Sequence, residues 1–254
     1  MVGFLSKYAM INNKKLWNPD NNDLGYFKNQ LKIPYESTKQ IFKFLNTYIN
    51  DLSSQKVLDV GTGSGANVFF LNENYKVGEI VGVDLHKEYI DLANSYKQEN
   101  YENHKNVNFW VHDFNKIDKK MNFDGIMCHQ TISFVEDGME MLMKILSQNV
   151  DWILLSSLFY DGLIEVESII KIFQNGNQED YKLRKYTTFS IPIIESLIKK
   201  YNYKNIKFKK FELKIDLTQK NINKMGTYTI KTEAGNLQLS GPLLMNWYFV
   251  LIRK

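Results

Sequence analysis

The chain has 254 residues, of which 44% are hydrophobic and 24% are charged, and its formal net charge is +4. These values describe an ordinary globular protein with enough material for one sizeable core. No run of eighteen apolar residues is present to span a membrane, and we expect no secretory signal in the first fifteen residues. The single cysteine, Cys128, cannot form an internal disulfide and fits a reducing compartment. We therefore expect a cytoplasmic protein.

Lysine supplies almost all of the positive charge, because Arg184 and Arg253 are the only arginines. Arginine is the side chain that best makes bidentate contacts with phosphates and bases. A chain so poor in arginine is not typical of nucleic-acid-binding proteins, and its lysine and asparagine content is typical of an AT-rich genome. The composition therefore argues against nucleic acid as a partner.

The first fifty residues differ in character from the rest. Residues 12–30 are polar, rich in Asn and Asp, and interspersed with aromatic side chains. We interpret them as irregular or short helical structure that lies over a binding crevice. From Ser37 the pattern becomes helical, with Ser37 and Gln40 as a capping box. Its apolar residues fall at helical spacing: Ile41, Phe44, Leu45, Tyr48 and Ile49.

The stretch from Lys56 to Leu71 contains the most informative pattern. Residues 57–60 are typical of a short buried strand, Gly61, Gly63 and Gly65 predict a tight turn, and an apolar run then begins a helix. Such a unit places a helix N-terminus and bare backbone beside the carboxyl end of a strand, where open α/β sheets bind nucleotides. The spacing G-x-G-x-G is one residue shorter than that of dinucleotide dehydrogenases.

Strands alternate with helices beyond this turn. The alternation predicts an α/β fold with a parallel, doubly wound sheet and helices on both faces. Two of the strands end in acidic residues, Asp84 and Asp113, and an acidic side chain about twenty residues after a glycine turn can accept hydrogen bonds from ribose hydroxyls. We expect strands over residues 79–85, 107–114, 123–130 and 151–158, and helices over 87–100 and around Met139–Leu146.

The C-terminal third has a different rhythm. Apolar residues at 166, 169, 170 and 173 predict a further helix, and the polar residues 175–187 predict a surface loop. Pro192 lies in the first turn of a helix that we expect to end near Tyr201. We expect an edge strand over 206–217, a hairpin over 227–232 and 237–240, and a final strand over 247–252. We predict an N-terminal lid and helix (1–50) and a core (51–254) with a hairpin insertion at 216–245.

The D-V-G-T-G-S-G segment around Gly61, together with Asp84 and Asp113, resembles the motifs of the class I S-adenosylmethionine (SAM) methyltransferases. The resemblance implies a Rossmann-like, seven-stranded sheet whose last strand runs antiparallel, with SAM as cofactor and S-adenosyl-L-homocysteine as product. It also implies a set of cofactor-binding residues: Asp59, Gly61, Thr62, Gly63 and Gly65 at the methionine part, Asp84 at the ribose, Leu85, Asp113 and Phe114 at the adenine, and His129 beside the methyl group.

Residues just past the fourth strand are candidates for catalysis. Methyl transfer is an in-line displacement in which positioning supplies most of the rate, and a base is needed only where the acceptor must lose a proton. We predict His129 as that base, Glu136 as a second candidate, and Gln130 as a substrate contact. No Cys/His cluster has metal-ligand spacing, so we predict no metal.

The acceptor is best described as a small polar metabolite. The segment CHQTISF (128–134) lacks the Pro-Pro motif of base-amino methyltransferases, and Cys128 follows Met127 rather than the proline of cytosine-C5 enzymes. Arg184 and Tyr186 resemble the Arg-x-Tyr stretch with which phosphoethanolamine methyltransferases hold the substrate phosphate. Where those enzymes place a catalytic histidine, this chain has Phe134. We also expect an aromatic lid or cage from Trp17, Tyr26, Tyr35 and Tyr160.

We therefore expect methyl transfer to an oxygen or nitrogen of a small acceptor that bears a phosphate or sugar. Three alternatives remain open at this point. They are a methyltransferase of RNA or protein, a non-catalytic methyltransferase-like binding subunit, and an NAD-dependent dehydrogenase, which the shortened glycine spacing disfavours. The sequence does not determine the identity of the acceptor or the oligomeric state.

Overall fold

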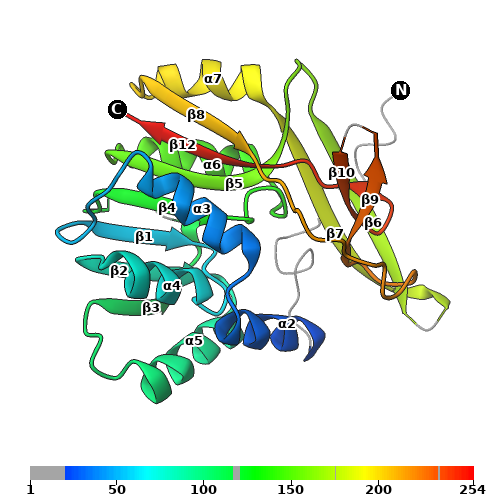
Figure 1. The fold of residues 1–254 in the computed structure, drawn as a ribbon, viewed down its shortest axis with the longest axis horizontal. Helices are drawn as coiled ribbons and strands as arrows, with labels where there is room; N and C mark the ends of the chain where they lie inside the picture. Colours follow the sequence, from blue (N-terminus) through cyan, green and yellow to red (C-terminus); the bar gives the residue numbers. More distant parts are fainter. Residues whose placement is uncertain (1–20, 117–120, 175, 234) are drawn as a thin grey trace.

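The computed structural model describes residues 21–116, 121–174, 176–233 and 235–254. Its centre is a twisted sheet in the strand order β3-β2-β1-β4-β5-β12-β8 (Figure 1). The strands of this path are β1 (Lys56–Val60), β2 (Glu79–Asp84), β3 (Val107–Val111), β4 (Gly125–His129), β5 (Trp152–Tyr160), β8 (Asn205–Lys210) and β12 (Trp247–Arg253). The predicted doubly wound, mostly parallel sheet is confirmed, but the sheet has nine strands rather than seven, because β6 (Val166–Gln174) and β7 (Asn177–Ser190) join it beside β5.

Strand direction positions the site. β1 pairs in parallel with β2 on one side and with β4 on the other, whereas β12 runs antiparallel between β5 and β8. The chain order therefore reverses between β1 and β4. In open α/β sheets ligands bind outside the carboxyl ends of the strands at such a reversal. The glycine turn follows β1 at that place.

Helices cover both faces of the sheet and form two cores. One core packs α3 (Glu36–Asn46), α4 (Ala66–Tyr75) and α5 (Lys87–Asn100) against one face. The other packs α6 (Gly138–Ser147) and α7 (Ile191–Lys200) against the opposite face (Figure 1). Successive side chains of a strand point to opposite faces. Val57 and Met127 accordingly belong to the first core, and Leu58 and Ile126 to the second.

The helix α2 (Asn21–Lys32) lies beside the N-terminal ends of α4 and α5 (Figure 1). The Ser64 hydroxyl donates to the Phe27 carbonyl oxygen at 3.2 Å, and the Tyr96 hydroxyl donates to that of Leu31 at 3.1 Å. The Phe27 ring lies 4.3 Å from the ring of Tyr89, centroid to centroid. These contacts hold α2 against the glycine turn and α5 at the carboxyl edge of the sheet. We call α2 the lid helix.

The predicted helix around residues 166–173 is wrong, and so is the predicted loop at 175–187. The chain forms a long antiparallel hairpin here, β6 (Val166–Gln174) and β7 (Asn177–Ser190), which we call the arm. The apolar spacing fitted a helix, but the segment is rich in valine and isoleucine, whose branched side chains favour strands. The Asn-Gly pair at 175–176 is typical of a hairpin turn, and Gly176 has a φ of +73°.

Two smaller features complete the fold. The expected hairpin is present as β9 (Thr227–Thr232) and β10 (Gly235–Ser240), with β11 (Leu243–Leu244) as the third strand of a separate sheet. The expected capping box is wrong, because α3 begins at Glu36 and its N-cap, Tyr35, makes no side-chain cap hydrogen bond. Gln40 instead donates to the Glu36 carboxylate at 2.9 Å. No helix in the described part of the chain is long and apolar enough to cross a bilayer.

Candidate functional site

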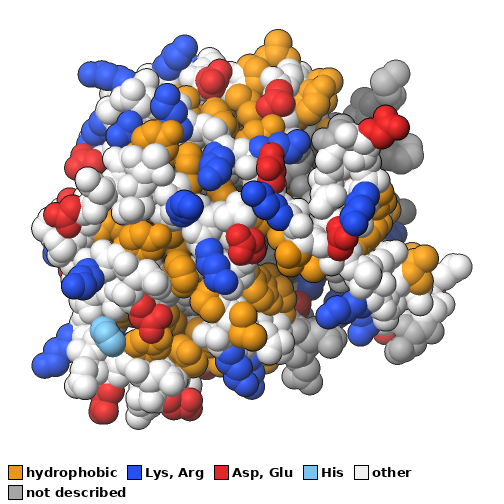
Figure 2. Space-filling view, in the orientation of Figure 1, with side chains coloured by type: hydrophobic (Ala, Val, Ile, Leu, Met, Phe, Trp, Pro, Cys, Tyr) orange, Lys and Arg blue, Asp and Glu red, His pale blue; other side chains and the backbone are white. Residues whose placement is uncertain are grey.

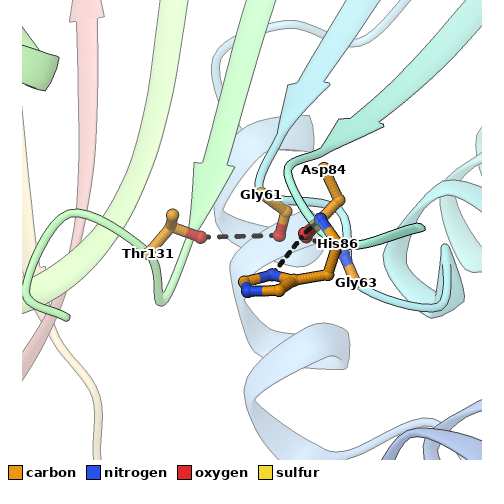
Figure 3. Close-up of polar contacts among 5 residues, drawn as sticks. All are labelled: Gly61, Gly63, Asp84, His86 and Thr131. Atoms are coloured by element: carbon orange, nitrogen blue, oxygen red, sulfur yellow. Dashed lines mark hydrogen bonds and ion pairs between the residues drawn. The ribbon is translucent and has the colours of Figure 1, made fainter. Parts of the chain in front are cut away.

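The glycine turn, residues 61–65, joins β1 to α4 at the carboxyl edge of the sheet. Gly61 and Gly63 have φ values of +73° and +55°, which residues with a Cβ rarely adopt. A Cβ on Gly61 would lie 2.4 Å from Thr131 Oγ1, and one on Gly63 would lie 2.6 Å from Phe27 Cε1. The Thr131 hydroxyl lies 3.5 Å from the Gly61 carbonyl oxygen (Figure 3) and 3.1 Å from that of His129. The loop after β4 and the lid helix therefore both contact the turn.

Asp84, the last residue of β2, is hydrogen-bonded to this turn. Its carboxylate accepts from the backbone N–H of Gly63 at 2.9 Å and from that of His86 at 3.0 Å. Asp84 Oδ1 also lies 3.1 Å from His86 Nδ1 (Figure 3). A carboxylate has about four acceptor positions. Three are in use, so one remains for a ligand hydroxyl.

Asp59 lies beneath the turn and is 1% exposed. The Thr62 hydroxyl donates to Asp59 Oδ2 at 2.8 Å. Burial raises the pKa of Asp59 to about 7; the hydrogen bond from Thr62 opposes this shift and the nearby Asp84 charge adds to it. A buried carboxylate that has no cation beside it stabilises a cationic group of a ligand more than a solvated carboxylate does.

The tip of β4 presents His129 on the same face of the sheet as Asp59. His129 is the register partner of Ser156 on β5, so the two side chains point to the same side. His129 Nδ1 and Ser156 Oγ are buried and have no hydrogen-bond partner among the described residues. Burial lowers the pKa of His129 to about 4, so the imidazole is neutral at physiological pH. Gln130 follows with a φ of +52°, a strained value for a residue other than glycine.

The predicted adenine contacts lie near the ends of β2 and β3. Leu85 is half-buried directly after Asp84. The Asp113 side chain is 26% exposed and lies 3.7 Å from Lys116 Nζ. Phe114 is buried in the core on the α6 side of the sheet.

The predicted aromatic residues do not form one group. Tyr26 and Tyr35 are neighbours, with ring centroids 5.4 Å apart, whereas Tyr160 is exposed at the end of β5 beside Gly162. Trp17 lies outside the described residues.

Glu136, the second candidate base, is exposed ahead of α6, and its carbonyl oxygen accepts from Lys185 Nζ at 2.5 Å.

Arg184 and Tyr186 are buried strand residues of β7 rather than parts of a solvated loop. Arg184 Nη2 lies 3.4 Å from Asp23 Oδ2 on the lid helix. The Tyr186 ring contacts Phe134 edge-on, with centroids 5.1 Å apart.

Two residues of the site, Asp23 and Thr131, were not predicted from the sequence. Thr131 follows β4 with no motif to mark it, and Asp23 is one acidic residue in a polar segment.

Comparisons with known proteins agree with this geometry. A family profile described as "Methyltransferase domain" matches residues 51–167. The last strand, β12, runs antiparallel, as the resemblance to the class I SAM-dependent methyltransferases implies. This chain has the class I methyltransferase fold, and residues 51–167 match a methyltransferase domain.

Two curated relatives and two solved structures are similar to this chain. An uncharacterized protein, MJ0906 of Methanocaldococcus jannaschii, is 27% identical over 77% of this chain and 54% of its own length. A ubiquinone biosynthesis O-methyltransferase of Rickettsia bellii is 24% identical over 57% of this chain and 56% of its own length. The chain thus spans about half the length of these relatives.

The solved structures show the same fold at low sequence identity. One is the complex between the Haloferax volcanii Trm112 methyltransferase activator and a methyltransferase, with a TM-score of 0.57, 14% identity, and coverage of 90% of this chain and 93% of the other. Another is magnesium protoporphyrin IX methyltransferase from Synechocystis PCC 6803 with bound S-adenosylhomocysteine. Its TM-score is 0.55 and its identity 12%, over 95% of this chain and 92% of the other.

The residues at this edge of the sheet fit SAM as the cofactor. Buried polar atoms without a partner among the described residues lie next to the turn or the β4 tip: His86 Nε2, His129 Nδ1 and Ser156 Oγ. The bare backbone of the turn, the acceptor position left on Asp84 and the buried Asp59 suit a nucleoside that carries a cationic amino acid. In the described ranges, no group of three His, Cys, Asp or Glu side chains is placed to hold a metal ion. Cys128 is buried, which raises the pKa of its thiol and makes it unsuited to be a nucleophile.

Proposed function

We propose that this protein transfers a methyl group from SAM to an oxygen or nitrogen of a small polar acceptor that carries an anionic group. The observation that carries the proposal is Arg184, a buried arginine at the boundary between the lid helix and the arm. Guanidinium groups bind carboxylates and phosphates in a fixed geometry. A buried one that pairs with the lid helix supports an acceptor with such a group.

The cofactor side of the reaction rests on the turn and the strand tips. Bound SAM supplies an electrophilic methyl group on its sulfonium. Asp84 would orient the ribose through the acceptor position that Gly63 and His86 leave open. Asp59 would take the amino group of the methionine part. Thr131 and Phe27 limit the space on either side of the turn, so the cofactor would be held in one orientation.

His129 is the side chain best placed to contact the acceptor. A general base works best when its pKa lies near the operating pH. Since burial lowers the pKa of His129 to about 4, its neutral ring would accept a hydrogen bond and orient the acceptor more than it would remove a proton. This favours acceptors that are already nucleophilic, such as a neutral amine or an acidic hydroxyl group. Glu136 remains a proposed base, although it is exposed ahead of α6.

A screen for S-adenosylhomocysteine release tests the proposal. Phosphorylated amines, sugars and sugar nucleotides are incubated with the protein and SAM, and the product is quantified for each. The Asp84→Asn variant, with a weakened ribose contact, is the matched control and should lose product formation with every acceptor. SAM binding without release on any acceptor would instead indicate a non-catalytic binding subunit.

A second candidate is a methyltransferase of RNA or protein. A groove of about 620 Å³ lies between α3 and the end of β8, and five of its eight lining residues are lysines: Lys39, Lys43, Lys209, Lys210 and Lys214. Glu36 and Glu212 line the same groove, and Figure 2 shows basic side chains interspersed with acidic and hydrophobic ones on this face. RNA binding that weakens steeply with salt would favour this candidate.

A further inference from the structure

An ion pair joins the lid helix to the arm. Arg184 Nη2 lies 3.4 Å from Asp23 Oδ2, and the exposed fractions of the two side chains are 9% and 19%. Arg184 Nη1 also donates to the carbonyl oxygen of Leu183 at 3.2 Å. The paired residues are 161 positions apart in the chain. The pair therefore forms only when the lid helix and β7 are both in place.

A second cationic side chain lies on the same strand face as Arg184. Side chains alternate along β7, so Lys182, Arg184 and Tyr186 share one face of the arm. Burial, followed by the charges of Arg184 and Lys224, lowers the pKa of Lys182. Asp23 therefore pairs with an arginine whose strand face also carries a lysine.

The lid helix also connects this pair to the cofactor cradle. Burial raises the pKa of the Asp23 carboxyl group, and the charge of Arg184 opposes this shift. One helical turn after Asp23, the Phe27 carbonyl oxygen accepts from the Ser64 hydroxyl at 3.2 Å, and the Phe27 ring would lie 2.6 Å from a Cβ on Gly63. Asp23 therefore belongs to the same helix as the residue that covers the glycine turn, and an anionic group bound to Arg184 would lie at this helix.

We propose that Asp23 is the resident counter-ion of an oxyanion site on Arg184. The Asp23 carboxylate pairs with the guanidinium while no acceptor is bound, and a phosphate group of the acceptor replaces it there. This rests on the proposed function, because it takes Arg184 as the acceptor-binding residue. A carboxylate and a phosphate offer the guanidinium similar oxygen geometry. Their negative charges repel each other at close range, so one displaces the other.

Calorimetric titration with inorganic phosphate tests the proposal. Phosphate is titrated into the wild-type protein and into three variants, with and without S-adenosylhomocysteine. Asp23→Asn should tighten phosphate binding by roughly tenfold, because the competing carboxylate is lost, as expected for one charged hydrogen bond. Arg184→Lys should weaken it, because lysine lacks the planar fork.

The control is Glu167→Gln on the same hairpin. Glu167 pairs with Lys185 at 2.8 Å, and Lys185 points to the opposite face of β7 from Arg184. Phosphate affinity should not change in this variant. Unchanged or weakened phosphate binding in Asp23→Asn, or an equal gain in Glu167→Gln, overturns the proposal. Circular dichroism establishes that each variant is folded.

The titrations also separate this proposal from the proposed function. If wild-type protein binds no S-adenosylhomocysteine, the proposed function is wrong whatever phosphate does. If it binds S-adenosylhomocysteine but Asp23→Asn binds no phosphate, the counter-ion proposal alone is wrong.

Discussion

The cofactor cradle and the arm are built by different kinds of interaction. The cradle, residues 56–86 with the β4 tip, is a run of short strands and a glycine turn whose contacts are mostly local or between neighbouring strands. The arm, β6 and β7, is a long hairpin that contacts the rest of the molecule through β5, the lid helix and the loop after β4. A local motif marks the cradle, whereas the arm depends on contacts between distant segments.

Glycines with similar backbone angles in the two regions provide the sharpest test of this difference. Gly61 in the cradle and Gly176 in the arm both have a φ of +73°, but a Cβ would clash with Thr131 only at Gly61 and would meet nothing within 4 Å at Gly176. We expect Gly61→Ala to lower the free energy of unfolding by about 2–5 kcal/mol, from backbone strain plus overpacking. Gly176→Ala should cost about 1–2 kcal/mol, from backbone strain alone. Urea unfolding of both variants measures the difference, and equal losses would contradict the comparison.

The pH dependence of stability tests the burial of Asp59. Burial raises its folded-state pKa to about 7, from the usual value of about 4 for an aspartate, so between these values the folded state binds more protons than the unfolded state. The contribution of Asp59 to stability is therefore present below about pH 4 and is lost as the pH rises through 7. The loss is at most about 4 kcal/mol, at 1.36 kcal/mol for each pKa unit.

Asp59→Asn removes this dependence, because the amide does not titrate. The difference in unfolding free energy between variant and wild type, followed from pH 4 to pH 8, should rise in favour of the variant. A flat difference would mean that Asp59 is ionised throughout this range in the folded protein.

The ribose contact is tested by Asp84→Asn. We expect S-adenosylhomocysteine to bind about 10–100-fold more weakly, because a charged acceptor contributes about 1.5–3 kcal/mol to such a hydrogen bond. Isothermal titration calorimetry measures the change. Asp91→Asn, which breaks the exposed Lys87–Asp91 pair one helical turn into α5, is the control and should bind normally. Unchanged affinity in Asp84→Asn would remove this residue from the cofactor site.

The smallest expected effect concerns an ion pair of the arm. Glu167 is 65% exposed, so solvent screens its pairing with Lys185. We expect Glu167→Gln to change the free energy of unfolding by about 0.2–1 kcal/mol. Thermal unfolding detects a change of this size. A larger loss would show that the arm depends on this contact more than its exposure suggests.

The parts of the site that the sequence predicted are those carried by short motifs. The turn at Gly61–Gly65 and the acidic strand end at Asp84 follow from local rules, and the α5 helix was predicted with the bounds that the structure has. The arm was not predicted, because four apolar residues at helical spacing fitted two structures. Pairing of Val166 with Thr188 and of Phe173 with Tyr181 decided between them.

The sequence alone therefore determined the sheet, the glycine turn and the order of the acidic strand ends. These follow from backbone sterics and from the alternation of buried residues, which act over a few positions. The tertiary structure alone decided that Arg184 is buried and paired with Asp23, that Thr131 and Phe27 contact the turn, and that His129 and Ser156 share a face. Each of these depends on segments far apart in the chain meeting in the folded state, and no local pattern encodes such a meeting.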